Sequence, residues 1–254
     1  MKTKNSDWYK NIWTLDIKNQ SWVEDTENQV NFIIDTLSLT GKERILDLAC
    51  GFGRHSLSFA RKGFSVVGVD ITKEYIDDAI KSAEASSLDI DFIHSDIRDL
   101  RFKNEFDVVL NLADGAIGYL ENDGENLKIF DVIASALKPG GKHFMDICNA
   151  EHGECFFPKR CWEIGSKTLS LSEFDWDKEN RRMLFGGYEI AFGEILRKPG
   201  PIEADSIRLY SKAELEVILQ QRQMSIINTF SNYNGKEASF KELQLMVYSK
   251  KANK

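Results

Sequence analysis

Two glycines one residue apart, Gly51 and Gly53, follow a short apolar run that contains Asp47. Glycine allows a tight turn and lets a ligand approach the main chain closely. A helical pattern begins directly after the turn, and the N-terminus of a helix offers unpaired N–H groups and the positive end of the helix dipole. The stretch 44–56 therefore predicts a strand, a turn and a helix that bind a ligand through backbone groups.

Two more carboxylates stand where later strands are expected to end. Asp70 follows the apolar run 65–69, and Asp96 follows a short strand expected over 91–94. In an open α/β sheet, ligands bind at the carboxyl ends of the strands. Asp70 is therefore placed to accept hydrogen bonds from a ribose diol, while its alternative role is to cap the next helix. Asp96 stands at a similar place, and its alternative interpretation is an ordinary turn residue, because turns are rich in aspartate.

The pattern D-x-A-x-G-x-G at residues 47–53 resembles motif I of the class I S-adenosylmethionine-dependent methyltransferases, with Ala49 in place of the first glycine. The segments F-D-V-V-L at 106–110 and L-K-P-G-G at 137–141 resemble two further elements of that family, in the same order. The resemblance covers residues 30–148. It implies an α/β fold with a Rossmann-like, seven-stranded, mostly parallel sheet and helices on both faces, and S-adenosyl-L-methionine as the cofactor.

The resemblance also implies which residues bind the cofactor. Asp70 would hold the ribose, Asp96 and the backbone of Ile97 the adenine, and the backbone of 49–53 the methionine part. The residues expected at the cofactor are Asp47, Ala49, Cys50, Gly51, Gly53, Asp70, Ile71, Asp96, Ile97, Asn111 and Leu112. The residues expected to line the acceptor pocket are Tyr9, Trp22, Tyr119, Asn149 and Arg208.

Helices and strands alternate in the part of the chain that would build this site. Helical spacing predicts helices from Thr26, from Leu57, over 72–86, over 124–136 and from Ser211. The segments 26–29 and 211–214 have the pattern of a capping box, and Gly41 is the expected end of the first helix. Further strands are expected at 143–147, where the turn 137–141 has ended, and at 225–230 and 243–248.

The segment 149–207 departs from this alternation. Strand-like patterns at 162–164, 168–174, 183–185 and 188–192, with turn residues at 175–180, predict an antiparallel β insertion. Long insertions are usually functional, so we expect a lid that sets substrate choice, with a dimer surface as the alternative. The core domain would then consist of 1–148 and 208–254, with 1–40 forming an N-terminal flap and a helix.

The composition narrows the class of partner. The chain has 254 residues, 42% of them hydrophobic, and a net charge of −7, which suits one domain with an insertion and argues against nucleic acid. It shows neither a membrane-length apolar run nor a leader pattern, so we expect a cytoplasmic protein without a membrane partner. The four cysteines contain no C-x-x-C pair, so we expect reduced thiols and no metal site.

Methyl transfer depends chiefly on placing the acceptor in line with the methyl group. A general base is needed only where the acceptor must lose a proton, and His152, Tyr119 and Tyr188 are the candidates. The sequence thus predicts methyl transfer to an N or O nucleophile of a small molecule. Two alternatives remain: an NAD(P)-dependent oxidoreductase, although Ser56 replaces its third glycine, and a non-catalytic module that binds a partner through the insertion.

Overall fold

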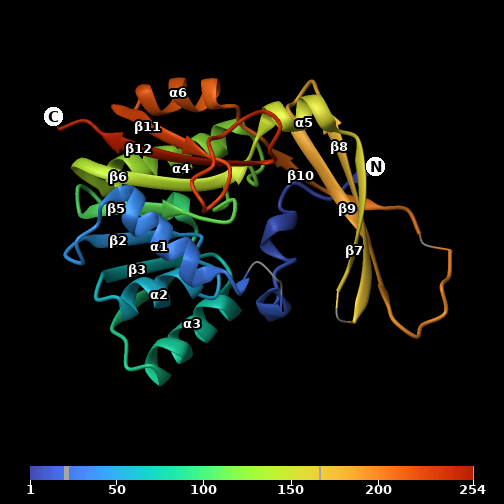
Figure 1. The fold of residues 1–254 in the computed structure, drawn as a ribbon, viewed down its shortest axis with the longest axis horizontal. Coiled ribbons are helices and arrows are strands. Elements are labelled where there is room, and N and C mark those ends of the chain that lie inside the picture. The colour runs from blue at the N-terminus through green and yellow to red at the C-terminus, as the bar shows by residue number, and fades with distance from the viewer. Residues whose placement is uncertain (20–22, 166, 199, 254) are drawn as a thin grey trace.

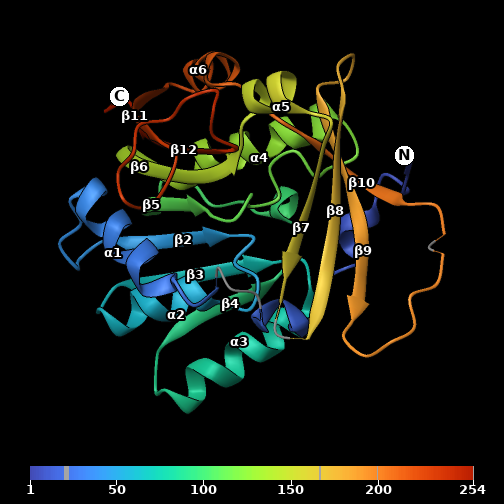
Figure 2. The same ribbon diagram turned by 45° about the vertical axis from the view of Figure 1, so that its right-hand side comes forward.

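The structure, a computed structural model, describes residues 1–19, 23–165, 167–198 and 200–253. It contains two sheets that lie beside each other. Figure 1 shows a sheet flanked by helices and, next to it, the long strands β7, β8 and β9 of the second sheet. The N-terminal segment, coloured dark blue, lies between the two sheets in Figures 1 and 2.

The first sheet has seven strands in the order β11-β12-β6-β5-β2-β3-β4. The strands from β6 to β4 are parallel, β12 pairs antiparallel with β6, and β11 pairs antiparallel with β12. This arrangement confirms the predicted fold. The strands are β2 (Arg44–Leu48), β3 (Ser65–Asp70), β4 (Ile90–His94), β5 (Phe106–Asn111), β6 (Leu137–Cys148), β11 (Met224–Phe230) and β12 (Gln244–Lys251).

Helices cover both faces of this sheet. On one face α1 (Thr26–Leu37) and α2 (Arg54–Arg61) pack on side chains such as Ile45 and Val66. On the other face α4 (Asp123–Ala136) and α6 (Lys212–Gln220) pack on side chains such as Leu46 and Val67. Because both faces are buried, the central strands have continuous apolar runs instead of polar alternation. α3 (Lys73–Ala85) follows β3, and α5 (Ala150–Phe156) follows β6.

Three local expectations for the core are wrong. The N-cap of α1 is Asp25, which makes no side-chain cap bond, and the Thr26 hydroxyl donates to the carbonyl of Val23. The helix ends at Leu37, because Ser38 adopts the left-handed conformation (φ 48°) ahead of Gly41. The segment 137–141 belongs to β6, where the pairing with β5 shifts register, so the strand starts earlier than expected. The capping box at 211–214 is confirmed.

The second sheet is the predicted antiparallel insertion, in the order β1-β10-β9-β8-β7, with β1 added parallel to β10. Two strands expected at 183–185 and 188–192 are one strand. The glycines between them do not interrupt it. A side chain on Gly187 would collide with the carbonyl of Leu171 on β8, so glycine is needed where the two strands approach each other. The strands are β1 (Lys2–Thr3), β7 (Lys159–Ile164), β8 (Thr168–Asp177), β9 (Arg182–Ala191) and β10 (Glu203–Arg208).

The N-terminal segment joins the insertion to the core. Its backbone bonds to β10, where the Lys4 N–H donates to the carbonyl of Ala204 at 2.9 Å. Further along, the Tyr75 hydroxyl of α3 donates to the carbonyl of Thr14 at 3.0 Å. Two short 3₁₀ helices, η1 (Trp8–Lys10) and η2 (Leu15–Asn19), lie along this path. The segment is therefore anchored on both sides of the strand tips.

Two findings concern the chain as a whole. In the described residues, no helix has both the length and the apolar character needed to cross a membrane. Cys50, Cys148, Cys155 and Cys161 are all unpaired, as the interpretation of the cysteines as reduced thiols requires.

Candidate functional site

The bend after β2 has a left-handed backbone at both glycines, with φ of 58° at Gly51 and 77° at Gly53. The two glycines have different surroundings. A Cβ on Gly53 would lie 2.8 Å from the Phe92 ring and 3.0 Å from Ala79, so this glycine lets α2 pack on its neighbours. A Cβ on Gly51 would meet only Tyr75, at 3.9 Å, and would otherwise project into open space. Gly51 therefore leaves room for a ligand against the main chain.

Ala49 occupies the position of the family's first glycine and also has a left-handed backbone, with φ of 56°. A non-glycine residue in this region costs on the order of 1 kcal/mol or more. The bend tolerates this strain because β2 pairs with strands on both sides and holds the backbone entering it.

Asp70 ends β3 directly beside the bend and is 7% exposed. Its Oδ2 accepts a hydrogen bond from the Gly51 N–H at 2.9 Å, and its Oδ1 accepts one from the Thr72 N–H at 2.7 Å. Burial raises the pKa of Asp70, although both of these N–H groups act to lower it. Each oxygen keeps a second lone pair, so the carboxylate fixes the bend and can still accept from two ligand hydroxyls.

Asp47 supports the bend from below. It is 2% exposed, and its Oδ2 accepts a hydrogen bond from the Ser56 hydroxyl at 2.6 Å. Burial raises the pKa of Asp47 to about 6, against the lowering effects of Ser56 and Arg54. Ser56, at the position where a dinucleotide-binding turn has its third glycine, therefore anchors α2 to β2.

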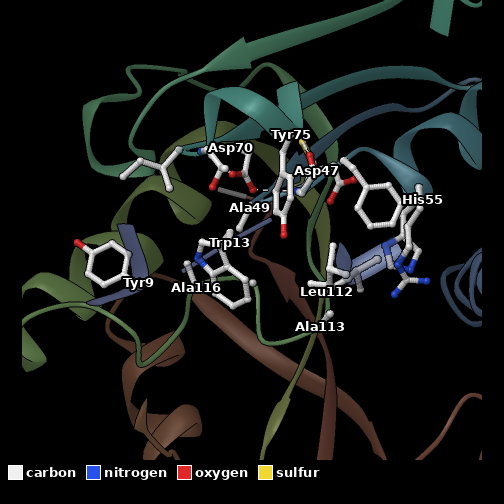
Figure 3. A pocket seen from close by; sticks show the side chains of 18 of the residues that line it. Tyr9, Trp13, Asp47, Ala49, His55, Asp70, Tyr75, Leu112, Ala113 and Ala116 are labelled. Atoms are coloured by element: carbon white, nitrogen blue, oxygen red, sulfur yellow. Dashed lines mark hydrogen bonds between the residues drawn. The ribbon is translucent and has the colours of Figure 1, made fainter. Parts of the chain in front are cut away.

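A cavity opens over the bend and encloses about 780 Å³ together with its open mouth. Figure 3 shows Asp70 and Asp47 along one side of it, and Trp13, Ala116 and Leu112 along the other. Its wall comes from the bend, the tip of β3, the loop after β5 and the N-terminal segment. Of the residues expected at the cofactor, Asp47, Ala49, Cys50, Gly51, Asp70, Ile71 and Leu112 line it, as do Tyr9 and Tyr119 of the expected acceptor pocket.

A smaller hollow adjoins this cavity at the tips of β3 and β4. It shares Tyr9, Ala49 and Asp70 with the larger cavity and adds Asp96 and Ile97. Asp70 therefore borders both spaces, which together form one cleft. Apolar side chains of the loop after β5 and of α4 close the inner side. Its mainly apolar lining, together with the carboxylates of Asp70 and Asp96, suits a purine ring.

Asp96 is held by a partner that the sequence did not suggest. Arg98 donates to both of its carboxylate oxygens, at 2.6 Å from Nη2 and 3.0 Å from Nε, and these bonds keep the pKa of Asp96 below its usual range despite burial. The same guanidinium pairs with Glu121 and Glu125 and donates to the Tyr9 hydroxyl at 3.3 Å. This network connects the N-terminal segment to the smaller hollow.

The loop after β5 is strained where it lines the cavity. Four consecutive residues, Ala113, Asp114, Gly115 and Ala116, have φ between 51° and 68°, and only one of them is glycine. Such runs persist only where the surroundings fix them, and they gather at functional sites. Asn111, which does not line the cavity, is buried below the loop and donates to the Gly115 carbonyl at 3.0 Å. Its role in the structure is to hold the loop.

Several expected residues lie away from the cavity. His152, on α5, stacks on Phe156, and the Tyr188 hydroxyl donates to the carbonyl of Gly200 on the insertion. Asn149 caps α5 by accepting from the Glu151 N–H at 3.0 Å. Arg208 is 8% exposed and pairs with Glu214 and Asp123 beside a separate polar hollow. Trp22 lies outside the described residues.

The sequence analysis missed part of the cavity wall. Trp13 and Ile17 come from the N-terminal segment, and Arg54, His55 and Tyr75 from the starts of α2 and α3. The aromatic residues of the first 22 positions indicated a flap but not which rings face the ligand. Arg54 and His55 directly follow Gly53, and this position next to the glycine turn was the signal that could have placed them at the cavity.

The comparisons with known proteins agree with this geometry. Residues 45–141 match the family described as a methyltransferase domain. Residues 45–141 of this chain therefore form a methyltransferase domain. Over 111 residues it is 37% identical to the putative methyltransferase YqeM of Bacillus subtilis, which covers 43% of this chain and 44% of the relative. The ubiquinone biosynthesis O-methyltransferase of Ruegeria pomeroyi is 32% identical over 136 residues, 53% of either chain.

A solved S-adenosylmethionine-dependent methyltransferase from Clostridium acetobutylicum shares the fold, with a TM-score of 0.76 and 19% identity over 93% of this chain and 96% of that chain. The sequence matches cover less of each protein than this structural match does. The chain spans about half the length of the curated relatives it matches. The family model ends at residue 141, before the insertion begins.

The residues present fit S-adenosyl-L-methionine, the cofactor of such domains. Asp70 retains lone pairs for a diol, Gly51 leaves open space along the main chain, and the smaller hollow accepts a flat ring beside Asp96. In this cofactor the ribose joins the adenine to the methionine part, and Asp70 correspondingly borders both spaces.

Proposed function

We propose that this protein transfers a methyl group from S-adenosyl-L-methionine to a small molecule held between the core and the N-terminal segment. One observation carries the proposal: Asp70 borders both the hollow beside Asp96 and the cavity that reaches Tyr119. A single cleft thus runs from the adenine position to the acceptor side. A cofactor laid along it would direct its sulfur toward the loop after β5.

In this proposal the chain's own residues bind and orient. Asp70 accepts from the ribose hydroxyls, Asp96 and the Ile97 N–H meet the adenine, and the bend at 49–53 lies along the methionine part. The cofactor supplies a methyl group on a positively charged sulfur, which is already strongly electrophilic. The remaining task of the protein is to place the acceptor and exclude water.

The acceptor side favours a small molecule. The cavity is narrow and is covered by the N-terminal segment, whose Trp13 and Tyr9 line it. The net charge of −7 disfavours a phosphate backbone as the partner. One relative is named for ubiquinone biosynthesis, which supports the same class. We assign the lid to the N-terminal segment together with the insertion 149–207.

Calorimetry with the full chain tests the proposal. Titration with S-adenosylhomocysteine should give one site per chain with micromolar affinity, on the order of −8 kcal/mol. NADH, titrated in parallel, should not bind. If neither S-adenosylmethionine nor S-adenosylhomocysteine binds, the proposed function is wrong.

A further inference from the structure

We propose that the methyl acceptor is a basic amine, recognised as a cation by the Tyr119 hydroxyl oxygen with Asp114 behind it. The inference rests on the proposed function and names the substrate class of the same cleft. It concerns the part of the wall formed by the strained loop after β5 and by the residues around Tyr119.

The hydrogen bond between Tyr119 and Asp114 decides what the tyrosine can offer. The Tyr119 hydroxyl donates its only proton to Asp114 Oδ2 at 3.1 Å, while Asp114 Oδ1 accepts from the Cys148 N–H at 3.2 Å. Tyr119 lines the cavity and is 9% exposed. With its proton committed, the hydroxyl can only accept, so a ligand group bound there must be a hydrogen-bond donor.

The charge behind Tyr119 favours a cationic donor over a neutral one. The Asp114 N–H donates to the carbonyl of Asp146 at 2.7 Å, and the Asp146 carboxylate accepts from the Tyr233 hydroxyl at 2.7 Å. Arg54 acts electrostatically on Asp146, whereas no lysine or arginine of the described residues acts on Asp114 in the same way. A buried carboxylate is costly without a counter-ion, and a bound ammonium would supply one to Asp114.

Aromatic rings complete the surroundings. Trp13 stacks on Tyr119 with ring centroids 6.1 Å apart and an angle of 8° between the planes, and Trp8 lies 5.3 Å from Tyr119. Tyr9 lines the same cavity. The faces of such rings attract ammonium groups and give a neutral hydroxyl no comparable gain. Tyr119 thus combines an accepting oxygen, a carboxylate behind it and stacked aromatic neighbours.

The backbone around Asp114 is strained. Asp114 lies in the run of four left-handed residues, which turns its side chain toward Tyr119, and Asn111 holds the run from below. Strain of this kind is expected where a particular side-chain placement is needed.

Tyr119 and Asp114 can together accept the proton that the ammonium must lose before it reacts. An N–H bond of the ammonium breaks, and its proton forms an O–H bond with the Tyr119 oxygen. The original Tyr119 proton moves along the existing hydrogen bond to Asp114 Oδ2, which becomes neutral. The electron pair of the broken bond stays on nitrogen, so the amine gains the free lone pair that it needs as a nucleophile. Tyr119 is the residue that touches the acceptor, and Asp114 is a positioning residue.

The test compares two probes of the same shape, benzylammonium and benzyl alcohol, on the full chain saturated with S-adenosylhomocysteine. Calorimetry or ligand-observed NMR gives the two affinities. The expected preference of the wild-type chain for benzylammonium is about tenfold, the value of one hydrogen bond to a charged partner.

Asp114→Asn and Tyr119→Phe should each reduce this preference to below about threefold, because the first removes the charge behind Tyr119 and the second removes the accepting oxygen, while both keep the shape. Asp131→Asn is the matched control. Asp131 lies exposed on α4 and pairs with Arg222. Its replacement changes the net charge by the same amount as Asp114→Asn without touching the cavity. S-adenosylhomocysteine affinity should stay within about twofold of the wild type in all three variants.

The outcomes separate the two proposals. If S-adenosylhomocysteine itself does not bind, the proposed function fails. If it binds but benzylammonium is not preferred or does not bind up to about 10 mM, only the amine inference fails. A preference that survives in Tyr119→Phe also overturns the inference, and this variant decides the matter should Asp114→Asn lower the melting temperature.

Discussion

The two sides of the cleft are built by different physical means. The cofactor side lies at the tips of β2 and β3, where regular parallel pairing fixes the backbone and Asp70 is held by two N–H groups. The acceptor side is formed by a loop of left-handed residues and by an N-terminal segment anchored through side chains. The first side follows from the sheet itself, and the second depends on contacts specific to this chain.

This difference explains what each side can do. A cofactor common to many methyltransferases needs only glycines and a carboxylate at fixed strand positions, so the fold supplies its site. An acceptor specific to one enzyme needs side chains drawn from distant segments. Changes on the cofactor side should therefore alter binding of any adenosyl ligand, while changes on the acceptor side should leave that binding intact.

The largest expected effect tests the cofactor side. Asp70→Ala removes both the ribose acceptor and the bonds that hold the bend, so S-adenosylhomocysteine affinity should fall about 100-fold, the equivalent of 2–3 kcal/mol. Calorimetry measures it. Asp91→Asn, an exposed residue of the neighbouring strand β4, is the control and should bind like the wild type. An Asp70→Ala chain that binds as tightly as the parent would remove the ribose assignment.

The two glycines of the bend should separate stability from binding. Gly53→Ala places a Cβ against Phe92 and Ala79 in a left-handed backbone, so the free energy of unfolding should fall by about 2 kcal/mol. Gly51→Ala meets no close neighbour except Tyr75, and it should lower stability less but weaken the cofactor more. Denaturant unfolding and calorimetry on both variants check this; equal behaviour of the two would contradict the separate roles.

Asp146 tests the acceptor side through pH. Burial raises its pKa to about 6, so the folded state binds its proton more tightly than the unfolded state does. The stability that this proton confers is present below about pH 4 and is lost as the pH rises through about 6. Asp146→Asn should therefore gain about 1 kcal/mol or more relative to the wild type between pH 4 and pH 7.

Denaturant unfolding at several pH values measures this difference. The cofactor side offers a contrast, because Asp96 has a lowered pKa from its pairing with Arg98. Asp96→Asn should show the opposite sign, losing stability relative to the wild type as the pH rises from about 3 to 5. If the difference between Asp146→Asn and wild type is constant with pH, the raised pKa of Asp146 is wrong.

The smallest effect concerns the strained position of the cofactor side. Ala49→Gly relieves the left-handed backbone but adds freedom to the unfolded chain, so the free energy of unfolding should rise by less than about 1 kcal/mol. The melting temperature of the variant checks the sign. A decrease would mean that the Ala49 methyl group packs more favourably than its conformation costs.

The structure brings Asp47, Asp70 and the bend at 49–51 to one cavity, as their positions at the ends of neighbouring strands predict, and their cofactor contacts stay a prediction. The sequence did not predict the left-handed run at 113–116, since three of those residues have no intrinsic preference for that backbone. The sequence analysis did not single out Arg98, because its role depends on contacts with Tyr9 and Glu121, which lie far from it in the chain. The early end of α1 at Ser38 likewise depends on tertiary contacts.

The acceptor residues show the same limit. The resemblance implied Asn149 and Arg208 at the acceptor pocket, but the structure uses one as a helix cap and the other in an ion-pair cluster. Tyr119 reaches the cavity because the loop before it turns left-handed. No pattern in the chain marks which of several polar residues a loop will direct inward.

A crystal structure of the full chain with S-adenosylhomocysteine tests the central claim most directly. The account predicts both ribose hydroxyls on the Asp70 carboxylate, the adenine beside Asp96 and Ile97, and the sulfur facing the loop that carries Tyr119. Ligand density outside the cleft that Asp70 borders, or a ribose that makes no contact with Asp70, would contradict it.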